Sequence, residues 1–184
     1  MARLNPIQSK TKSGMETVIR SPEASEAESI LNATREMIQT SAHLLIQPEE
    51  FRLTTAQEEA YIDRHLQDSG KMMIAAYVAE APIGVLTFAS GHLKRNSHVG
   101  TLAMTVLSNY RGQGVGRQML DALISWAKLA PGIEKIELEV QSKNAPAIAL
   151  YDKLGFQTEG KSLRAIRFSD GQYDDVIRMG LFVK

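Results

Sequence analysis

The chain has 184 residues, and its 21 Lys and Arg side chains balance 21 Asp and Glu, so a formal net charge of zero excludes a globally basic nucleic-acid binder. Hydrophobic residues make up 43% of the chain, enough for the core of about one domain, and the absence of cysteine excludes disulfides, zinc–cysteine sites and thiol nucleophiles. No apolar run approaches the roughly 18 residues of a membrane span, and the polar N-terminus lacks the apolar segment of a secretory signal. We expect a cytoplasmic protein without a membrane or nucleic-acid partner.

The N-terminal segment, residues 1–14, is polar and without periodicity, which indicates a flexible tail before a single domain over residues 15–184. Residues 16–20 form a short candidate strand. Ser21 is a suitable helix cap with Pro22 in the first turn, and apolar residues recur at helical spacing from Ala27 to Ile38. The sequence therefore predicts a helix that begins after Ser21.

The next segments change from helical to strand patterns. Thr54 or Thr55 caps a second helix that ends before Gly70. Further strands are predicted over residues 72–79, 83–90, 99–107, 135–141, 156–168 and 173–183, and further helices over the residues after Val115 and over residues 144–154. This order predicts an α/β fold (α+β in the finer classification), with a mixed sheet flanked by about four helices.

A glycine-rich segment between the predicted strand 99–107 and the following helix carries the densest chemical signal. It reads Arg-Gly-Gln-Gly-Val-Gly-Arg, from Arg111 to Arg117. Glycine allows the backbone to approach a ligand closely, and a helix N-terminus favours a phosphate. A Walker loop would need Lys-Ser/Thr after its last glycine, and a dinucleotide fingerprint would need glycine in place of Arg117, so both are excluded. The remaining pattern is Arg-x-x-Gly-x-Gly.

A second segment, residues 144–156, contains two polar side chains on one predicted helix. Asn144 is a good cap, and Tyr151 lies two turns further on nearly the same face. Periodicity alone also allows Tyr151 to be a core aromatic residue. Before this helix, Glu137 and Glu139 alternate with apolar residues, so they share the polar face of strand 135–141.

Taken together, these two segments resemble the GNAT superfamily of acyl-CoA-dependent N-acetyltransferases. The resemblance covers the chain from about Met15 and is sharp over residues 104–156, where residues 138–156 look most like the enzymes that acetylate the N-terminal alanine of ribosomal proteins. It implies a largely antiparallel sheet that splays open between its fourth and fifth strands, with the cofactor in the cleft. It also implies acetyl-CoA as co-substrate, and an acceptor that is a small-molecule amine or a protein N-terminal amine.

The resemblance also assigns roles to particular residues. Tyr151 would protonate the departing thiolate, and Glu139 would be the general base, with Glu137 or an ordered water as alternatives. The residues implied to bind the cofactor are Met104, Thr105, Val106, Arg111, Gly112, Gln113, Gly114, Val115, Gly116, Arg117 and Asn144.

These roles fit the chemistry of acyl transfer. An amine attacks a thioester only when it is neutral, a carboxylate can take its proton, and a phenol can donate one to the leaving sulfur. A non-catalytic acyl-CoA sensor of the same fold is the alternative function. The four histidines are scattered, so no metal site is predicted. The acceptor, and whether the protein is a homodimer, stay open.

Overall fold

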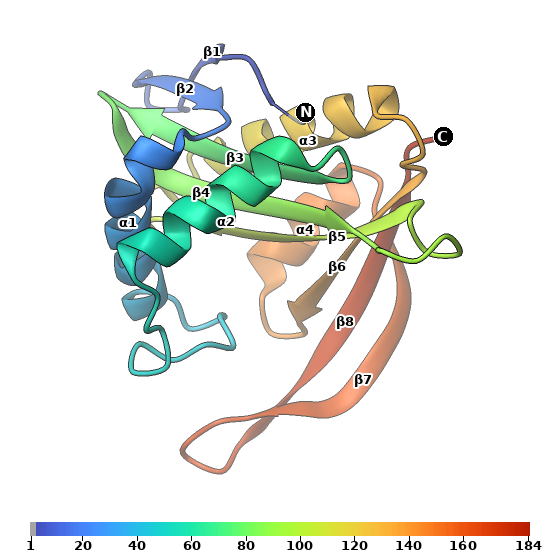
Figure 1. Ribbon diagram of the computed structural model, residues 1–184. Helices are drawn as coiled ribbons and strands as arrows, with labels where there is room; N and C mark the ends of the chain where they lie inside the picture. Colours follow the sequence, from blue (N-terminus) through green and yellow to red (C-terminus); the bar gives the residue numbers. More distant parts are fainter. Residues whose placement is uncertain (1–2) are drawn as a thin grey trace.

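The computed structural model describes residues 3–184 as one sheet with helices on both faces (Figure 1). The sheet has eight strands in the order β1-β2-β3-β4-β5-β6-β8-β7. Among the described residues, only β5 and β6 pair in parallel. The strands are β1 (Ile7–Lys10), β2 (Glu16–Arg20), β3 (Lys71–Val78), β4 (Ala81–Ser90), β5 (Val99–Val106), β6 (Lys135–Gln141), β7 (Gln157–Arg167) and β8 (Tyr173–Phe182). The helices are α1 (Ala27–Gln39), α2 (Thr55–Gln67), α3 (Val115–Leu129) and α4 (Ala145–Lys153), with short 3-10 turns at η1 (Ala24–Glu26) and η2 (Ser108–Tyr110).

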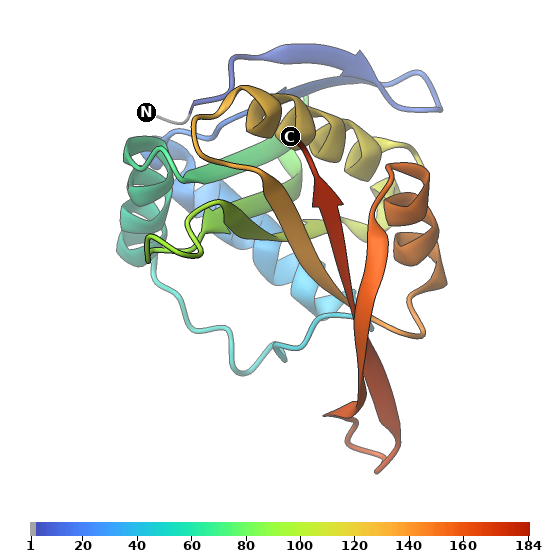
Figure 2. The same cartoon turned by 90° about the vertical axis from the view of Figure 1, so that its right-hand side faces the viewer.

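The central strand β3 separates two apolar cores. Met72, Ile74 and Ala76 point to the side of α3 and α4, whereas the alternate residues Met73 and Ala75 point to the side of α1 and α2. Because successive side chains of a strand face opposite sides, burial on both faces requires the continuous apolar run seen in the sequence. The two helical layers lie on opposite sides of the sheet in both views (Figures 1 and 2).

The parallel strands β5 and β6 part soon after they begin. Their pairing is limited to Val99 with Lys135, Gly100 with Ile136 and Thr101 with Glu137, although β5 continues to Val106 and β6 to Gln141. Within residues 3–184, the edge of β5 that faces β6 therefore has no strand partner beyond Thr101. This confirms the predicted splay between the strands 99–107 and 135–141, which are the fifth and sixth strands once β1 is counted.

The N-terminal segment differs from the expected tail over residues 7–10. These residues form β1, which pairs with β2 over four residues. The first two residues of the predicted tail lie outside the described part of the chain. A lone strand has no sequence signal of its own, because its stability comes from the neighbour with which it pairs.

Ser21 does not cap the first helix as predicted, and η1 precedes α1. Its hydroxyl accepts a hydrogen bond from the Leu4 amide (3.0 Å) and donates one to the Met73 carbonyl (2.9 Å), so tertiary partners have taken the capping oxygen. The cap of α2 is as predicted, because Thr54 Oγ1 accepts from the Gln57 amide at 3.3 Å and the Gln57 side chain accepts from the Thr54 amide.

Candidate active site

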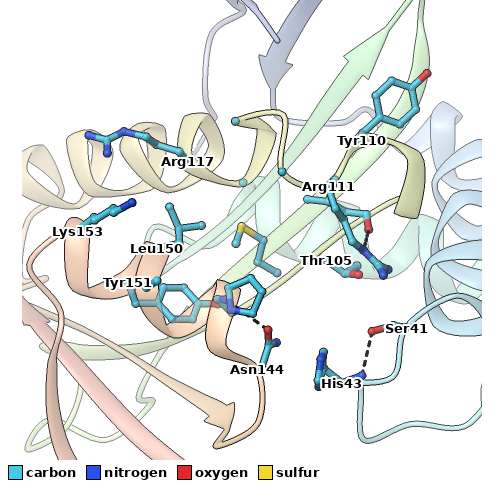
Figure 3. Close-up of a pocket in the computed structure, with 18 of the residues that line it drawn as sticks. Ser41, His43, Thr105, Tyr110, Arg111, Arg117, Asn144, Leu150, Tyr151 and Lys153 are labelled. Atoms are coloured by element: carbon cyan, nitrogen blue, oxygen red, sulfur yellow. Dashed lines mark hydrogen bonds between the residues drawn. The ribbon is translucent and has the colours of Figure 1, made fainter. Parts of the chain in front are cut away.

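A cleft of about 530 Å³ lies where β5 and β6 part (Figure 3). Its walls come from the end of β5, the glycine-rich loop, the first turn of α3, the helix α4, the loop after α1 and the turn between β1 and β2. The predicted site residues that line it are Met104, Thr105, Val106, Arg111, Gly112, Gly114, Gly116, Arg117, Asn144 and Tyr151. The cleft therefore brings together the two segments that carried the chemical signal in the sequence.

The glycine-rich loop needs its glycines for two different reasons. Gly112 and Gly114 have φ angles of +72° and +92°, in the left-handed region that side chains disfavour, and Gly114 is the N-cap of α3. Gly116 lies under the cleft, where an added Cβ would be 3.3 Å from Cε of Met104. The loop thus presents the amide groups of a helix N-terminus to the cleft, which favours an anionic ligand.

Arg111 lines the cleft and also joins two elements. Its Nε donates to the carbonyl of Val106 at 2.9 Å, and its Nη1 donates to the carbonyl of Thr40 at 3.1 Å. Val106 ends β5 and Thr40 caps α1, so the guanidinium holds the loop after α1 against the mouth of the splay. The structure thus shows that Arg111 positions the loop after α1, in addition to the contact with the cofactor that is predicted for it.

Two residues of the loop turn their side chains away from the cleft. The side chain of Gln113 donates to the carbonyl of Asn109 (3.0 Å) and accepts from the hydroxyl of Ser13 (2.6 Å). Val115 is 1% exposed and packs in the core with Met119. Any contact of Gln113 or Val115 with a ligand would therefore come from the backbone.

Helix α4 presents its predicted residues to the cleft. Asn144 caps the helix by accepting from the Ala147 amide at 3.3 Å, which uses only the oxygen of its side-chain amide. Tyr151 is 6% exposed and packs edge-on against Phe156, with 5.6 Å between the ring centroids. Burial raises the pKa of Tyr151 to about 12, so its phenol is protonated at neutral pH.

Glu139 does not line the cleft. It is exposed on β6, on the face opposite the buried side chains of Ile136 and Leu138, and its register partner on β8 is Arg178. Gln141 lies next on that face and is buried; its Oε1 is 3.3 Å from Nδ1 of His43. This face is therefore the one approached by the loop after α1.

Sequence reasoning missed several residues of the cleft. They are Lys12, Ser41, His43, Leu44, Tyr110, Pro146, Ala147, Ala149, Leu150 and Lys153. Helical spacing from Ala147 could have indicated Leu150 and Lys153, which follow at intervals of three residues on α4. No local signal indicates Lys12 or His43, because each comes from a turn or loop that only the tertiary fold brings to the cleft.

The charges around the cleft have one sign. Its lining contains Lys12, Arg111, Arg117 and Lys153, and no carboxylate among the residues described. Arg117 pairs with Asp121 (3.4 Å), whereas the ion pairs found within residues 3–184 do not involve the other three cations. A polyphosphate ligand is complementary to such a lining.

No group of three or more His, Asp or Glu side chains within residues 3–184 could hold a metal ion. Over the same residues, every helix is too short or too polar to cross a membrane.

Residues 36–156 match the family model described as the acetyltransferase (GNAT) family. The chain is 32% identical over 115 residues to an L-amino acid N-acetyltransferase of Escherichia coli, covering 60% of this chain and 67% of the relative. It is 30% identical to an N-alpha-acetyltransferase of Saccharolobus solfataricus, covering 66% and 77%. It is also 30% identical to the [ribosomal protein bS18]-alanine N-acetyltransferase of Escherichia coli, covering 66% and 72%.

Solved structures agree with the fold. A GNAT acetyltransferase of Streptococcus pneumoniae superimposes with a TM-score of 0.87 at 23% identity, covering 90% of this chain and 99% of that one. The Salmonella typhimurium protein yncA, solved with its cofactor acetyl-CoA, has a TM-score of 0.79 at 19% identity, covering 91% and 94%. The splayed sheet, the glycine-rich loop at a helix N-terminus and these relatives lead to one assignment: the chain belongs to the acetyltransferase (GNAT) family and is an N-acetyltransferase.

Proposed function

We propose that this acetyltransferase passes the acetyl group of acetyl-CoA directly to a primary amine, within the cleft between β5 and β6. The observation that carries the proposal is the joining, in one cleft, of an anion-binding loop, an unpaired strand edge and a buried phenol. Each part matches one part of the cofactor: its phosphates, its amide-containing arm and its sulfur. The chain has no cysteine, and direct attack needs no covalent intermediate on the protein.

The cofactor would lie along the cleft from the loop to α4. The amides from Gly112 to Gly116 would bind the pyrophosphate. Beyond Thr101, the free edge of β5 offers backbone groups to the amides of the pantetheine arm, as one strand does to another. The thioester would then lie near Tyr151 and Asn144, at the open end of the splay.

Acyl transfer there conserves every proton. The amine nitrogen forms a bond with the acetyl carbon, the carbon–sulfur bond breaks, and the amine gives up one proton while the sulfur gains one. We assign Tyr151 to the sulfur, because it lines the cleft and its hydroxyl is protonated and makes no hydrogen bond to another described residue. Because its pKa of about 12 exceeds that of a thiol, near 8.5, its first contribution is a hydrogen bond to the thiolate.

Two groups compete for the role of base. Glu139 lies on the face of β6 that the acceptor would approach, but outside the cleft. His43 lines the cleft, and its Nδ1 faces an amide oxygen of Gln141, which only accepts hydrogen bonds. A tautomer of His43 with its proton on Nδ1 would donate to that oxygen and would leave Nε2 free to accept a proton. Glu139 stays the prediction from the sequence, and His43 is the alternative that the structure adds.

The acceptor would enter from the side of the loop after α1. The names of the relatives above state N-acetylation of an L-amino acid, N-alpha-acetylation, and acetylation of the alanine of a ribosomal protein. We infer a primary amine of the α-amino type, either in a small molecule or at a protein N-terminus. The relatives named above are all N-acetyltransferases by name, and none is a non-catalytic sensor.

A panel of amines with acetyl-CoA tests this proposal. Free amino acids, a polyamine, an antibiotic-like amine and peptides that differ in their first residue would be incubated with the protein. Thiol release and acetylated product would be measured together, because thiol release alone also reports hydrolysis. Acetylation of α-amino groups supports the proposal, and CoA binding without any acetylated product would favour the sensor. The cytoplasmic location and a homodimer stay predictions, to be tested by cell fractionation and sedimentation.

A further inference from the structure

The turn between β1 and β2 lies against the glycine-rich loop. The amide of Lys12 donates to the carbonyl of Gln113 at 3.0 Å, and the hydroxyl of Ser13 donates to the side chain of Gln113 at 2.6 Å. One turn into α3, Gln118 accepts from the hydroxyl of Thr17 (3.1 Å) and donates to the carbonyl of Lys10 (2.8 Å). Four hydrogen bonds thus join residues about a hundred positions apart in the sequence.

The hairpin that carries this turn is anchored to the body. The amide of Thr11 donates to the carbonyl of Met15, and that of Gly14 donates to the carbonyl of Thr11, which closes the turn. At the other end of β1, the backbone of Leu4 exchanges two hydrogen bonds with Ser21. Since β2 also pairs with β3, the turn is held as an extension of the central sheet.

Lys12 is the residue of this turn that lines the cleft. Its Cγ is 3.9 Å from the place that a Cβ on Gly114 would occupy, so its stem passes over the N-terminus of α3. The residue is exposed and is in none of the ion pairs found among residues 3–184. A lysine with four methylenes beyond Cα can bring its ammonium group to an anion held by that N-terminus.

We propose that the β1–β2 hairpin is part of the cofactor site and that Lys12 binds the pyrophosphate of CoA. The glycine-rich loop supplies amides and a helix dipole but only partial charges, and Lys12 adds a full positive charge beside Gly114. The hairpin makes this possible because its contacts with Gln113 and Gln118 fix the turn at the loop. This inference rests on the proposed function, since it assumes that the cleft binds CoA.

Calorimetry on two matched variants tests the inference. Lys12→Ala and Lys128→Ala remove the same charge, and Lys128 lies in the last turn of α3, about 20 Å from the loop at 1.5 Å per residue. We expect Lys12→Ala to bind CoA about three- to tenfold more weakly than the parent, and Lys128→Ala to bind like the parent. Lys12→Arg should recover most of the affinity. The loss should shrink at high salt, because exposed charges are screened.

Truncated ligands locate the contact. We expect Lys12→Ala to lose the same affinity for dephospho-CoA, which keeps the pyrophosphate. We expect it to lose no affinity for pantetheine, measured in competition with CoA. A loss with CoA that disappears with dephospho-CoA would assign Lys12 to the 3′-phosphate and overturn the proposal. Equal CoA affinity of Lys12→Ala and Lys128→Ala would overturn it as well. If the parent itself bound CoA no better than pantetheine, the proposed function would fail instead.

Discussion

Replacing Tyr151 by phenylalanine removes one oxygen atom from the cleft and leaves the packing of the ring in place. The ring is 6% exposed and contacts Phe156 edge-on, and both features survive the change. The hydroxyl has no hydrogen-bond partner among the described residues, so its loss should change the free energy of unfolding at pH 7 by less than about 0.5 kcal/mol. If the phenol serves the departing sulfur, turnover should fall about 10²-fold, or roughly 2.7 kcal/mol in the barrier.

Turnover is measured as thiol release together with acetylated product at saturating acetyl-CoA and acceptor. CoA affinity and melting temperature are determined on the same preparations. Tyr61→Phe on α2 is a matched control, because it removes a hydroxyl outside the cleft. We expect unchanged CoA affinity and melting temperature in Tyr151→Phe, with the loss confined to turnover. A turnover within about threefold of the parent would refute the role of Tyr151.

The raised pKa of Tyr151 provides a second test with the same variant. Between pH 10 and the folded pKa of about 12, the phenol ionises in the unfolded chain before it does so in the folded one. The contribution of the buried, neutral phenol to the free energy of unfolding is therefore complete below pH 10. It is lost as pH rises toward the folded pKa, by at most about 2–3 kcal/mol. Tyr151→Phe should lose less stability than the parent over that range. Parallel curves of melting temperature against pH would contradict the burial argument.

Three further changes test other parts of the site and fold. Gly114→Glu adds a negative charge and a side chain at a left-handed φ of +92°, so CoA affinity measured by calorimetry should fall at least tenfold. The fall should be larger than in Gly114→Ala, which introduces the backbone strain without the charge. Glu139→Gln should lower the rate of acetylation most at pH values where the amine is still protonated. An unchanged pH–rate profile for Glu139→Gln, together with a lower rate for His43→Gln, would assign the role of base to His43. Burial raises the pKa of Glu58, so the stability of the fold should fall as pH rises through the range above the ordinary glutamate pKa. Glu58→Gln should therefore raise the melting temperature at pH 7 but not at pH 4. Equal effects at both pH values would contradict this argument.

Much of the fold could be read from the sequence, because its strands and helices carry strong periodic patterns. The continuous apolar run of β3, the alternation in β6 and the helical stripe of α1 predicted their elements correctly. The cap of α2 was predictable because the hydrogen bonds between Thr54 and Gln57 lie within one turn. Ser21 was misassigned because its partners, Leu4 and Met73, are distant in the sequence.

The sequence by itself determined the local structure of the glycine-rich loop and of α4, where each feature depends on residues within one turn or one helix. Glycines at positive φ, an Asn cap and a Tyr two turns later are local requirements, and a local pattern can state them. Only the tertiary structure decided which other side chains reach the cleft. Lys12 arrives through the pairing of β1 with β2, and His43 through the bond of Arg111 to Thr40, contacts between segments that no periodicity links. It also showed that Glu139 lies outside the cleft. The sequence could not show this, because the alternation along a strand selects a face of the sheet but not the distance from the cleft where β5 and β6 part.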